Sequence, residues 1–212
     1  MRELKHRSSR VSLHSIFDKN NPMLSPQLRT HESLEGFLSR HPAFGGWHEE
    51  WDGVPLKFRT CLSTELPPRP FVGSVRAIVL RGDQVLVVHS PVPILSVGGR
   101  CNPEESIQQT LLREVGEETG WRILPVGVIG YIHAQHLDEQ RPAWGRPAPD
   151  FIDPLFAVEA LEFDQALLEP AAVRCEFIAI NAVGALGLDE INLTFLHEAL
   201  RRLQQVNQRS MS

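Results

Sequence analysis

The stretch that constrains this chain most is residues 98–121, which reads as a glycine loop, a capped helix and a stop. Asn102 is a favourable N-cap residue, because its side-chain oxygen can accept a hydrogen bond from a free amide of the first turn. Pro103 then falls at the first helical position, and Glu105 lies at the spacing that completes a capping box. Gly120 is a natural left-handed terminator. The pattern therefore predicts a helix over residues 103–119.

The two faces of this predicted helix differ in their chemistry. An apolar stripe at four-residue spacing consists of Ile107, Leu111 and Val115. Spacings of three and four residues point Glu114, Glu117 and Glu118 at one small region of space. An acidic helical stripe is most often a solvated surface. Alternatively, three carboxylates held together require a neutralising partner, and the hard cations Mg²⁺ and Mn²⁺ prefer oxygen ligands.

The same residues carry a family resemblance. They resemble the Nudix box, the signature of the Nudix hydrolases, in the order Gly99, five residues, Glu105, seven residues, Arg113-Glu114-Val115, one residue, Glu117-Glu118, one residue, Gly120-Trp121. Every fixed position of the box is filled. The resemblance implies an α/β fold, the Nudix-type α/β/α sandwich with a mixed β-sheet, and an N-terminal extension precedes it here.

The activity implied by the resemblance is hydrolysis of a phosphoanhydride (diphosphate) bond in a nucleoside-diphosphate-linked substrate, such as a nucleotide sugar, a nucleoside triphosphate or a dinucleotide. By the same resemblance, Glu114, Glu117 and Glu118 coordinate Mg²⁺ or Mn²⁺, and the backbone carbonyl of Gly98 adds a ligand. The bound metal neutralises phosphate charge and makes a bound water more acidic. Gly99 lets the backbone approach metal and phosphate without a Cβ in the way.

The general base is left open among several carboxylates. Glu114 and Glu118 are the candidates from the box, and one of them takes the proton of the attacking water. In some Nudix enzymes a later loop supplies the base, and the acids available there are Asp138, Glu139, Asp150 and Asp153. Arg113 and Glu105 complete the catalytic set, because Arg113 can aim a box carboxylate and Glu105 can hold the junction of loop and helix.

A Nudix-like module that senses or regulates through a nucleotide without cleaving it is the alternative function. Such modules usually lose carboxylates of the box, whereas this chain keeps Glu114, Glu117 and Glu118. The complete box therefore favours catalysis. The expected partner is a small nucleotide-derived substrate, and a homodimer is a further expectation because dimers are common among Nudix hydrolases.

The rest of the chain divides into two parts at a proline-rich stretch. Residues 1–65 form an N-terminal extension that we expect to be partly helical, with an amphipathic helix over residues 32–39. Pro67-Pro68-Arg69-Pro70 is typical of a linker, so residues 66–212 form the Nudix hydrolase domain. Trp47 and Trp51, within the extension, either pack against a core or a partner or stack on a ligand.

Short apolar runs separated by turn residues predict a series of strands. These are residues 56–63, 72–80, 85–89, 94–97, 121–133, 151–159 and 175–180. A closing amphipathic helix has one apolar side, formed by Leu193, Leu196, Leu200 and Leu203. Strands and helices in this order predict a mixed sheet between helices.

Two groups of residues outside the box have two interpretations each. His133 and His136, three residues apart, are either a second metal pair or two histidines at the end of a strand. Trp144, Arg146 and Asp150 follow in a polar loop. Trp144 and Arg146 either bind substrate, by stacking on a base and pairing with phosphate, or pack within the loop. Asp150 is a candidate auxiliary metal ligand or base at the substrate.

Charge and cysteine content argue against several classes of function. The net charge of −5 argues against stable nucleic-acid binding, which requires a basic surface to offset phosphate repulsion. The three cysteines show no paired spacing, so we expect neither a disulfide framework nor a zinc site. Reduced thiols in a cytoplasmic protein are the expected state of these cysteines. An apolar run of about 18 residues, as a membrane span requires, is absent from the sequence, so we expect no membrane span.

Overall fold

The computed structural model describes residues 33–210, except residues 92, 139–144, 171 and 173. Its helices are α2 (Leu34–Ser39), α3 (Ile107–Thr119) and α4 (Glu190–Ser210), with short 3₁₀ turns η1 (Arg69–Phe71) and η2 (Ile180–Leu186). Its strands are β1 (Ala43–Trp51), β2 (Val54–Leu62), β3 (Arg76–Arg81), β4 (Gln84–Val88), β5 (Ser96–Val97), β6 (Trp121–His136), β7 (Asp150–Phe163) and β8 (Cys175–Ala179). None of the described helices is long and apolar enough to cross a membrane.

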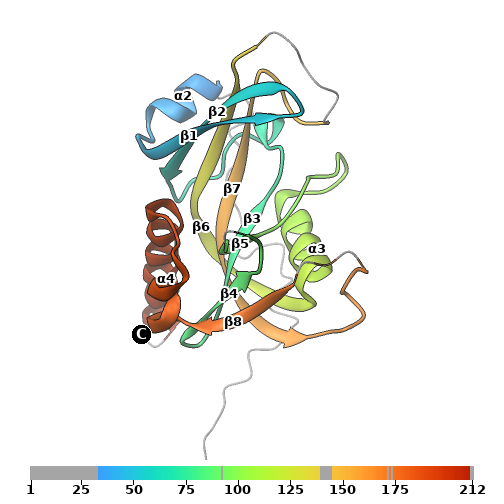
Figure 1. Ribbon diagram of the computed structural model, residues 1–212, viewed down its shortest axis with the longest axis vertical. Coiled ribbons are helices and arrows are strands. Elements are labelled where there is room, and N and C mark those ends of the chain that lie inside the picture. Colours follow the sequence, from blue (N-terminus) through green and yellow to red (C-terminus); the bar gives the residue numbers. More distant parts are fainter. Residues whose placement is uncertain (1–32, 92, 139–144, 171, 173, 211–212) are drawn as a thin grey trace, which may run out of the picture.

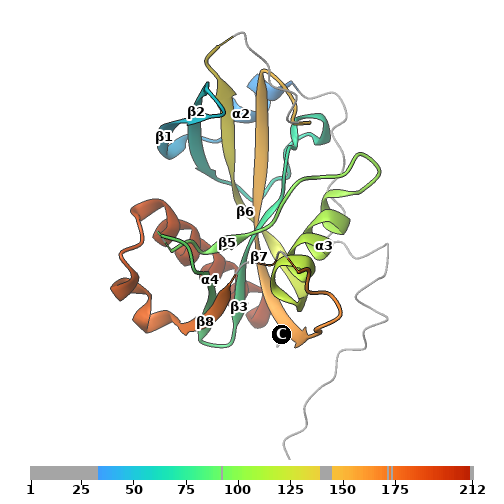
Figure 2. The ribbon, with the colours of Figure 1, turned by 45° about the vertical axis from the view of Figure 1, so that its right-hand side comes forward.

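The described strands form one mixed sheet in the order β1-β2-β6-β7-β3-β4-β8, with β5 paired to β3. At its centre β3 and β7 run parallel, pairing Arg76 with Leu155, and the neighbouring strand pairs are antiparallel. The two long strands β6 and β7 extend through the molecule (Figures 1 and 2). Beside their upper halves lie β1, β2 and α2, whereas α3 and α4 flank the lower part of the sheet (Figure 1).

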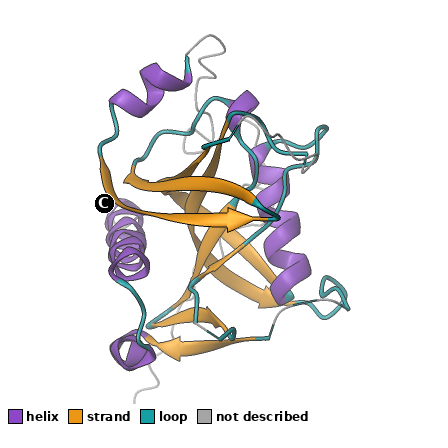
Figure 3. Ribbon diagram, turned by 45° about the horizontal axis from the view of Figure 1, so that its top comes forward, coloured by secondary structure: helices purple, strands orange, loops and turns teal. Residues whose placement is uncertain are grey.

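Alternating side chains of β3 build one core on each face of the sheet. The first core joins Ala77 and Val79 to α3 through Leu111 and Val115. The second joins Ile78 and Leu80 to α4 through Phe195, Leu196 and Ala199. A strand that is apolar on both faces needs a helix on each side. Figure 3 shows the sheet between these two helices, which confirms the predicted α/β/α sandwich.

A hairpin of β1 and β2 extends the sheet on its N-terminal side. The sequence predicted β2, but β1 was missed. Trp47 stacks flat on Phe58, with ring centroids 4.7 Å apart, and Trp51 packs against Phe58 and Phe151. Both tryptophans therefore pack on the sheet. Because β2 pairs with β6, the hairpin continues the sheet, and a domain boundary near residue 65 remains a prediction.

Helix α3 begins at Ile107 rather than at the predicted Pro103. Ser106 is its N-cap residue, and the Ser106 hydroxyl accepts a hydrogen bond from the amide of Gln109 at 3.2 Å. The Gln109 side chain returns the contact by accepting from the amide of Ser106 at 2.9 Å. Gly120 ends the helix in the left-handed conformation, as predicted.

The predicted capping box of Asn102 and Glu105 is therefore wrong. The Glu105 carboxylate accepts hydrogen bonds from Arg113 at 2.7 Å and from the Thr110 hydroxyl at 3.0 Å. Because these two groups hold the carboxylate against the body of the helix, Glu105 does not cap its first turn. Ser106 and Gln109, the next pair at the same spacing, form the capping box instead.

Candidate active site

The loop of residues 98–105, here called the box loop, is held by the chain segment directly before β3. The amide of Val75 donates a hydrogen bond to the carbonyl oxygen of Gly99 at 2.9 Å. The Arg69 guanidinium donates to the carbonyl oxygens of two box-loop residues, at 3.1 and 3.2 Å. Sequence reasoning placed Arg69 in a linker, because the box pattern does not reach so far upstream. The structure shows that this segment anchors the box loop.

Gly98 and Gly99 bring the box loop into close contact with β3 and α3. Gly98 has a φ of +137°, and a Cβ on it would lie 2.2 Å from the carbonyl oxygen of Val75. A Cβ on Gly99 would lie 2.1 Å from a carboxylate oxygen of Glu114. Both distances are far shorter than any real contact. Gly98 therefore requires glycine, because its Cβ would meet backbone at a positive φ, whereas a Cβ on Gly99 would displace the Glu114 carboxylate.

Arg113 gathers three carboxylates around one guanidinium group. Its Nε lies 2.7 Å from Oε1 of Glu105, and its Nη1 lies 2.8 Å from Oε1 of Glu114 and 2.8 Å from Oε2 of Glu117. One nitrogen therefore brings the carboxylates of Glu114 and Glu117 together. The hydrogen bonds from Arg113 lower the pKa of Glu105 from its usual 4.5 to about 2. Arg113 is thus placed to orient carboxylates of the box, which is the role predicted for it from the sequence.

Glu118 is held separately, at the start of the box loop. Its Oε2 accepts a hydrogen bond from the amide of Gly98 at 2.8 Å. Burial raises the pKa of Glu118 above its usual value, the Gly98 amide opposes that shift, and the charge of Glu114 adds to it. The nearby cation of Arg76, at the start of β3, also favours the ionised form of Glu118. The box pattern gives no signal for Arg76, which lies before it in the sequence.

The predicted metal ligands Glu114, Glu117 and Glu118 follow one another along α3 and offer oxygen donors, as a hard divalent cation prefers. Within residues 33–210, apart from residues 92, 139–144, 171 and 173, no group of three or more His, Cys, Asp or Glu side chains is arranged as a ready metal centre. The contacts explain this, because Arg113 holds two of the carboxylates and Gly98 holds the third. The donor chemistry fits Mg²⁺ or Mn²⁺, and their binding here remains a prediction.

The candidates for substrate binding have other neighbours in this structure. Trp144 lies outside the described residues, as does Glu139. Arg146 lies 3.2 Å from Oδ2 of Asp153, and its guanidinium lies 5.3 Å from the ring centroid of Trp51 and 4.6 Å from that of Phe151. Arg146 is thus engaged by a carboxylate and two aromatic rings, and a substrate-binding role for it remains a prediction.

His133 and His136 lie at the end of β6 and bind different partners. Nε2 of His133 lies 3.2 Å from Oδ1 of Asp150, and Nδ1 of His133 accepts a hydrogen bond from Arg59 at 3.0 Å. Nδ1 of His136 lies 2.6 Å from the carbonyl oxygen of Pro149. These contacts favour the interpretation of two strand-end histidines over a second metal pair. The pairing of Arg59 with His133 was not predicted, because the two residues are far apart in the sequence.

Comparisons with known proteins agree with this geometry. The family model described as "NUDIX domain" matches residues 70–199. No curated protein matches the chain. Among solved structures, a Nudix hydrolase from Nitrosomonas europaea is 22% identical over 60% of this chain and 87% of its own, with a TM-score of 0.43.

Two other solved structures show a similar degree of likeness. The pyrophosphohydrolase BsRppH from Bacillus subtilis is 15% identical over 76% of this chain and 97% of its own, with a TM-score of 0.45. The Nudix domain of NrtR from Shewanella oneidensis, solved with ADP-ribose, is 22% identical over 65% of this chain and 94% of its own, with a TM-score of 0.41. Because the family model covers more than half of the chain and contains the whole box, the chain belongs to the Nudix family and is a Nudix hydrolase.

Proposed function

We propose that this enzyme hydrolyses a phosphoanhydride bond in a nucleoside-diphosphate-linked compound, such as a nucleotide sugar, a nucleoside triphosphate or a dinucleotide. The observation that carries the proposal is the arrangement of the box carboxylates. One nitrogen of Arg113 contacts both Glu114 and Glu117, while Glu118 lies against the amide of Gly98. Such a cluster repels a phosphate unless a cation lies between them.

The cation in this proposal is Mg²⁺ or Mn²⁺, held by Glu114, Glu117, Glu118 and the carbonyl oxygen of Gly98. When bound, it supplies charge neutralisation for the phosphate and a more acidic water. Arg113 fixes the orientation of two of the three carboxylates, and the Gly98 amide holds the third. Gly99 is required beside Glu114, because any larger residue would displace that carboxylate.

Two carboxylates of the box are candidates for the general base. Glu118 uses Oε2 for the Gly98 amide, which leaves Oε1 to accept the proton of the attacking water. Glu114 already pairs Oε1 with the Arg113 cation, so that oxygen is engaged by another group. Geometry therefore favours Glu118 over Glu114, and we propose Glu118 as the base.

A screen for the phosphorylated products tests the proposed reaction, because cleavage of a diphosphate linkage releases phosphomonoesters or pyrophosphate that must be detected directly or converted enzymatically to inorganic phosphate. The purified chain is incubated with nucleotide sugars, nucleoside triphosphates and dinucleotides, in Mg²⁺, in Mn²⁺ and in chelator. We expect turnover of at least one class of substrate, and only with metal present. Absence of turnover for every class, together with a thermal stability unchanged by either metal, would refute the proposal. Light scattering on the same sample tests the predicted homodimer.

A further inference from the structure

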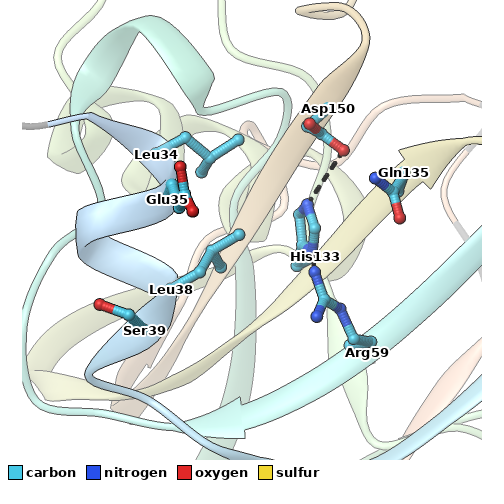
Figure 4. Close-up of a pocket in the computed structure, with 8 residues that line it drawn as sticks. All are labelled: Leu34, Glu35, Leu38, Ser39, Arg59, His133, Gln135 and Asp150. Atoms are coloured by element: carbon cyan, nitrogen blue, oxygen red, sulfur yellow. Dashed lines mark hydrogen bonds and ion pairs between the residues drawn. The ribbon is translucent and has the colours of Figure 1, made fainter.

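A cavity lies between α2 and the upper strands of the sheet, outside the box. Its volume is about 470 Å³, and Figure 4 shows the side chains that line it. None of these described residues belongs to residues 98–121. Arg59 lines this cavity, whereas its neighbour Phe58 packs into the aromatic cluster with Phe151. Successive strand residues face opposite sides, so the cavity opens on the face of β2 that is turned away from that cluster.

A buried histidine fixes two opposite charges at this cavity. The His133 side chain is only 1% exposed and lies between Arg59 on β2 and Asp150 on β7 (Figure 4). A guanidinium can only donate, so Nδ1 of His133 is the acceptor and Nε2 carries the hydrogen that faces Asp150. The neutral ring therefore satisfies both neighbours and spaces the cation from the anion by its own width.

Both charged groups keep hydrogen-bonding capacity that the described residues do not use. Arg59 has five N–H donors, of which one is given to His133, and it forms no ion pair with any residue of the described ranges. Asp150 uses Oδ1 for His133, and its second oxygen is left to accept from elsewhere. Half-buried charges with spare capacity gain most from a partner of opposite charge.

The wall formed by α2 contributes two leucines beside the polar side chains of Glu35 and Ser39. Leu34 and Leu38 are one helical turn apart on α2 and both line the cavity (Figure 4). The charged lining consists of the Arg59 cation and the carboxylates of Glu35 and Asp150, so a phosphate-rich ligand would meet more negative than positive charge. A neutral aliphatic ligand would leave both charges without a partner of opposite charge. The lining instead suits a molecule that carries one charge of each sign beside an apolar group.

We propose that this cavity binds a small zwitterion of the aliphatic α-amino-acid type. Its carboxylate pairs with Arg59, its ammonium group pairs with Asp150, and its side chain packs on Leu34 and Leu38. The volume lies within the range of about 300–1,000 Å³ that small-molecule sites occupy. This site is separate from the box carboxylates and does not depend on the reaction proposed for them.

Calorimetric titration of the full chain tests the proposal with defined probes. Alanine, valine, leucine, isoleucine and methionine are the zwitterions, isoamylamine lacks the carboxylate of leucine, and isocaproate lacks its ammonium group. We expect saturable binding of at least one amino acid at up to millimolar concentration, and at least about tenfold weaker binding of both analogues. Failure of every amino acid to bind overturns the proposal. Equal binding of either analogue, or binding of inorganic phosphate or ribose in place of the amino acids, does so as well.

Three variants assign the binding to this cavity. Arg59→Gln and Asp150→Asn keep a hydrogen-bonding partner for His133 but remove one charge each, and each should weaken binding at least about tenfold. Lys57→Gln removes a cation from the same strand outside the cavity lining and should leave binding unchanged. Equal binding by all three variants contradicts the assignment.

A measurement on the unaltered protein keeps the proposal testable if a variant fails to fold. In methyl NMR spectra, amino-acid binding should shift the resonances of Leu34 and Leu38 and leave that of Leu111 in α3 unchanged. Shifts confined to Leu111 would place the ligand at the box and overturn the proposal.

Discussion

Replacing Arg113 with lysine tests how the box carboxylates are held. Arg113 makes two hydrogen bonds to Glu105, of 2.7 and 3.0 Å, and one of 3.1 Å to the carbonyl oxygen of Arg100. Its Nη1 contacts Glu114 and Glu117, both at 2.8 Å. Lysine keeps the positive charge but offers a single nitrogen on a flexible stem, so it cannot reproduce this fork.

The magnitude follows from the number and exposure of these contacts. A hydrogen bond to a charged group contributes about 1.5–3 kcal/mol, and the Arg113 side chain is 27% exposed, so solvent weakens each contact. Lysine recovers part of the charge interaction. We therefore expect Arg113→Lys to lower the free energy of unfolding by about 2–3 kcal/mol. Because Glu114 and Glu117 lose their common donor, we expect kcat/KM to fall by about 10–100-fold.

Urea denaturation and steady-state kinetics of the same preparation measure both effects. Arg122→Lys is the matched control, because Arg122 forms one exposed ion pair with Asp164 and should show no measurable change in either quantity. If Arg113→Lys matches this control in stability and in kcat/KM, the account of Arg113 as the organiser of the box carboxylates is refuted.

Three further predictions concern α3 and the box loop that precedes it. Gly116→Ala should raise the free energy of unfolding by about 0.5–1 kcal/mol in urea titrations, because the added Cβ would lie 3.4 Å from Leu167, an ordinary contact, and alanine favours helix; a loss of stability would contradict this. Since Arg113 lowers the pKa of Glu105 to about 2, the ionised carboxylate stabilises the fold above pH 4.5. The stability advantage of the unaltered chain over Glu105→Gln should therefore shrink as the pH falls from 4.5 toward 2, whereas a constant difference would refute the linkage. Glu117→Gln should weaken Mn²⁺ binding, followed by electron paramagnetic resonance, by at least about tenfold, and unchanged affinity would remove Glu117 from the ligand set.

Local patterns in the sequence were sufficient for much of the fold. The apolar stripe of α3, its stop at Gly120 and the strands on either side follow short-range rules, and the structure confirms them. The start of α3 could not be chosen this way. Asn102 and Ser106 are both favourable caps with a suitable residue three positions later, and the choice depends on Arg113, which takes Glu105 from eight residues away.

Strand β1 and the cavity beside α2 depend on contacts between distant segments. β1 is largely exposed and contains Gly45 and Gly46, so it lacks the alternating apolar pattern that identifies a strand. Its position is set by pairing with β2 and by stacking of Trp47 on Phe58. The Arg59 and Asp150 charges of the cavity come from β2 and β7, which are brought together only by the register that each strand has with β6.

Among the box residues, Arg113 and its carboxylate neighbours were found from the sequence because the box spacing places them on adjacent turns. Arg69 and Arg76 were not found. Both lie in the segment before the box. Arg69 contacts the box loop, and Arg76 comes near Glu118, only when β3 and β5 pair. Residues that support a site from another strand leave no spacing signal in a single sequence.

If the carboxylates of α3 hold the metal and the base for hydrolysis of a phosphoanhydride, Glu118→Gln must remove most of the turnover. The measurement is the rate of product formation at saturating Mg²⁺, compared with Glu104→Gln, which removes an exposed carboxylate from the box loop. We expect Glu118→Gln to reduce kcat by at least about 10³-fold while circular dichroism shows the fold intact, and Glu104→Gln to retain normal activity. Near-normal turnover by a folded Glu118→Gln variant would contradict the account and place the chemistry elsewhere in the chain.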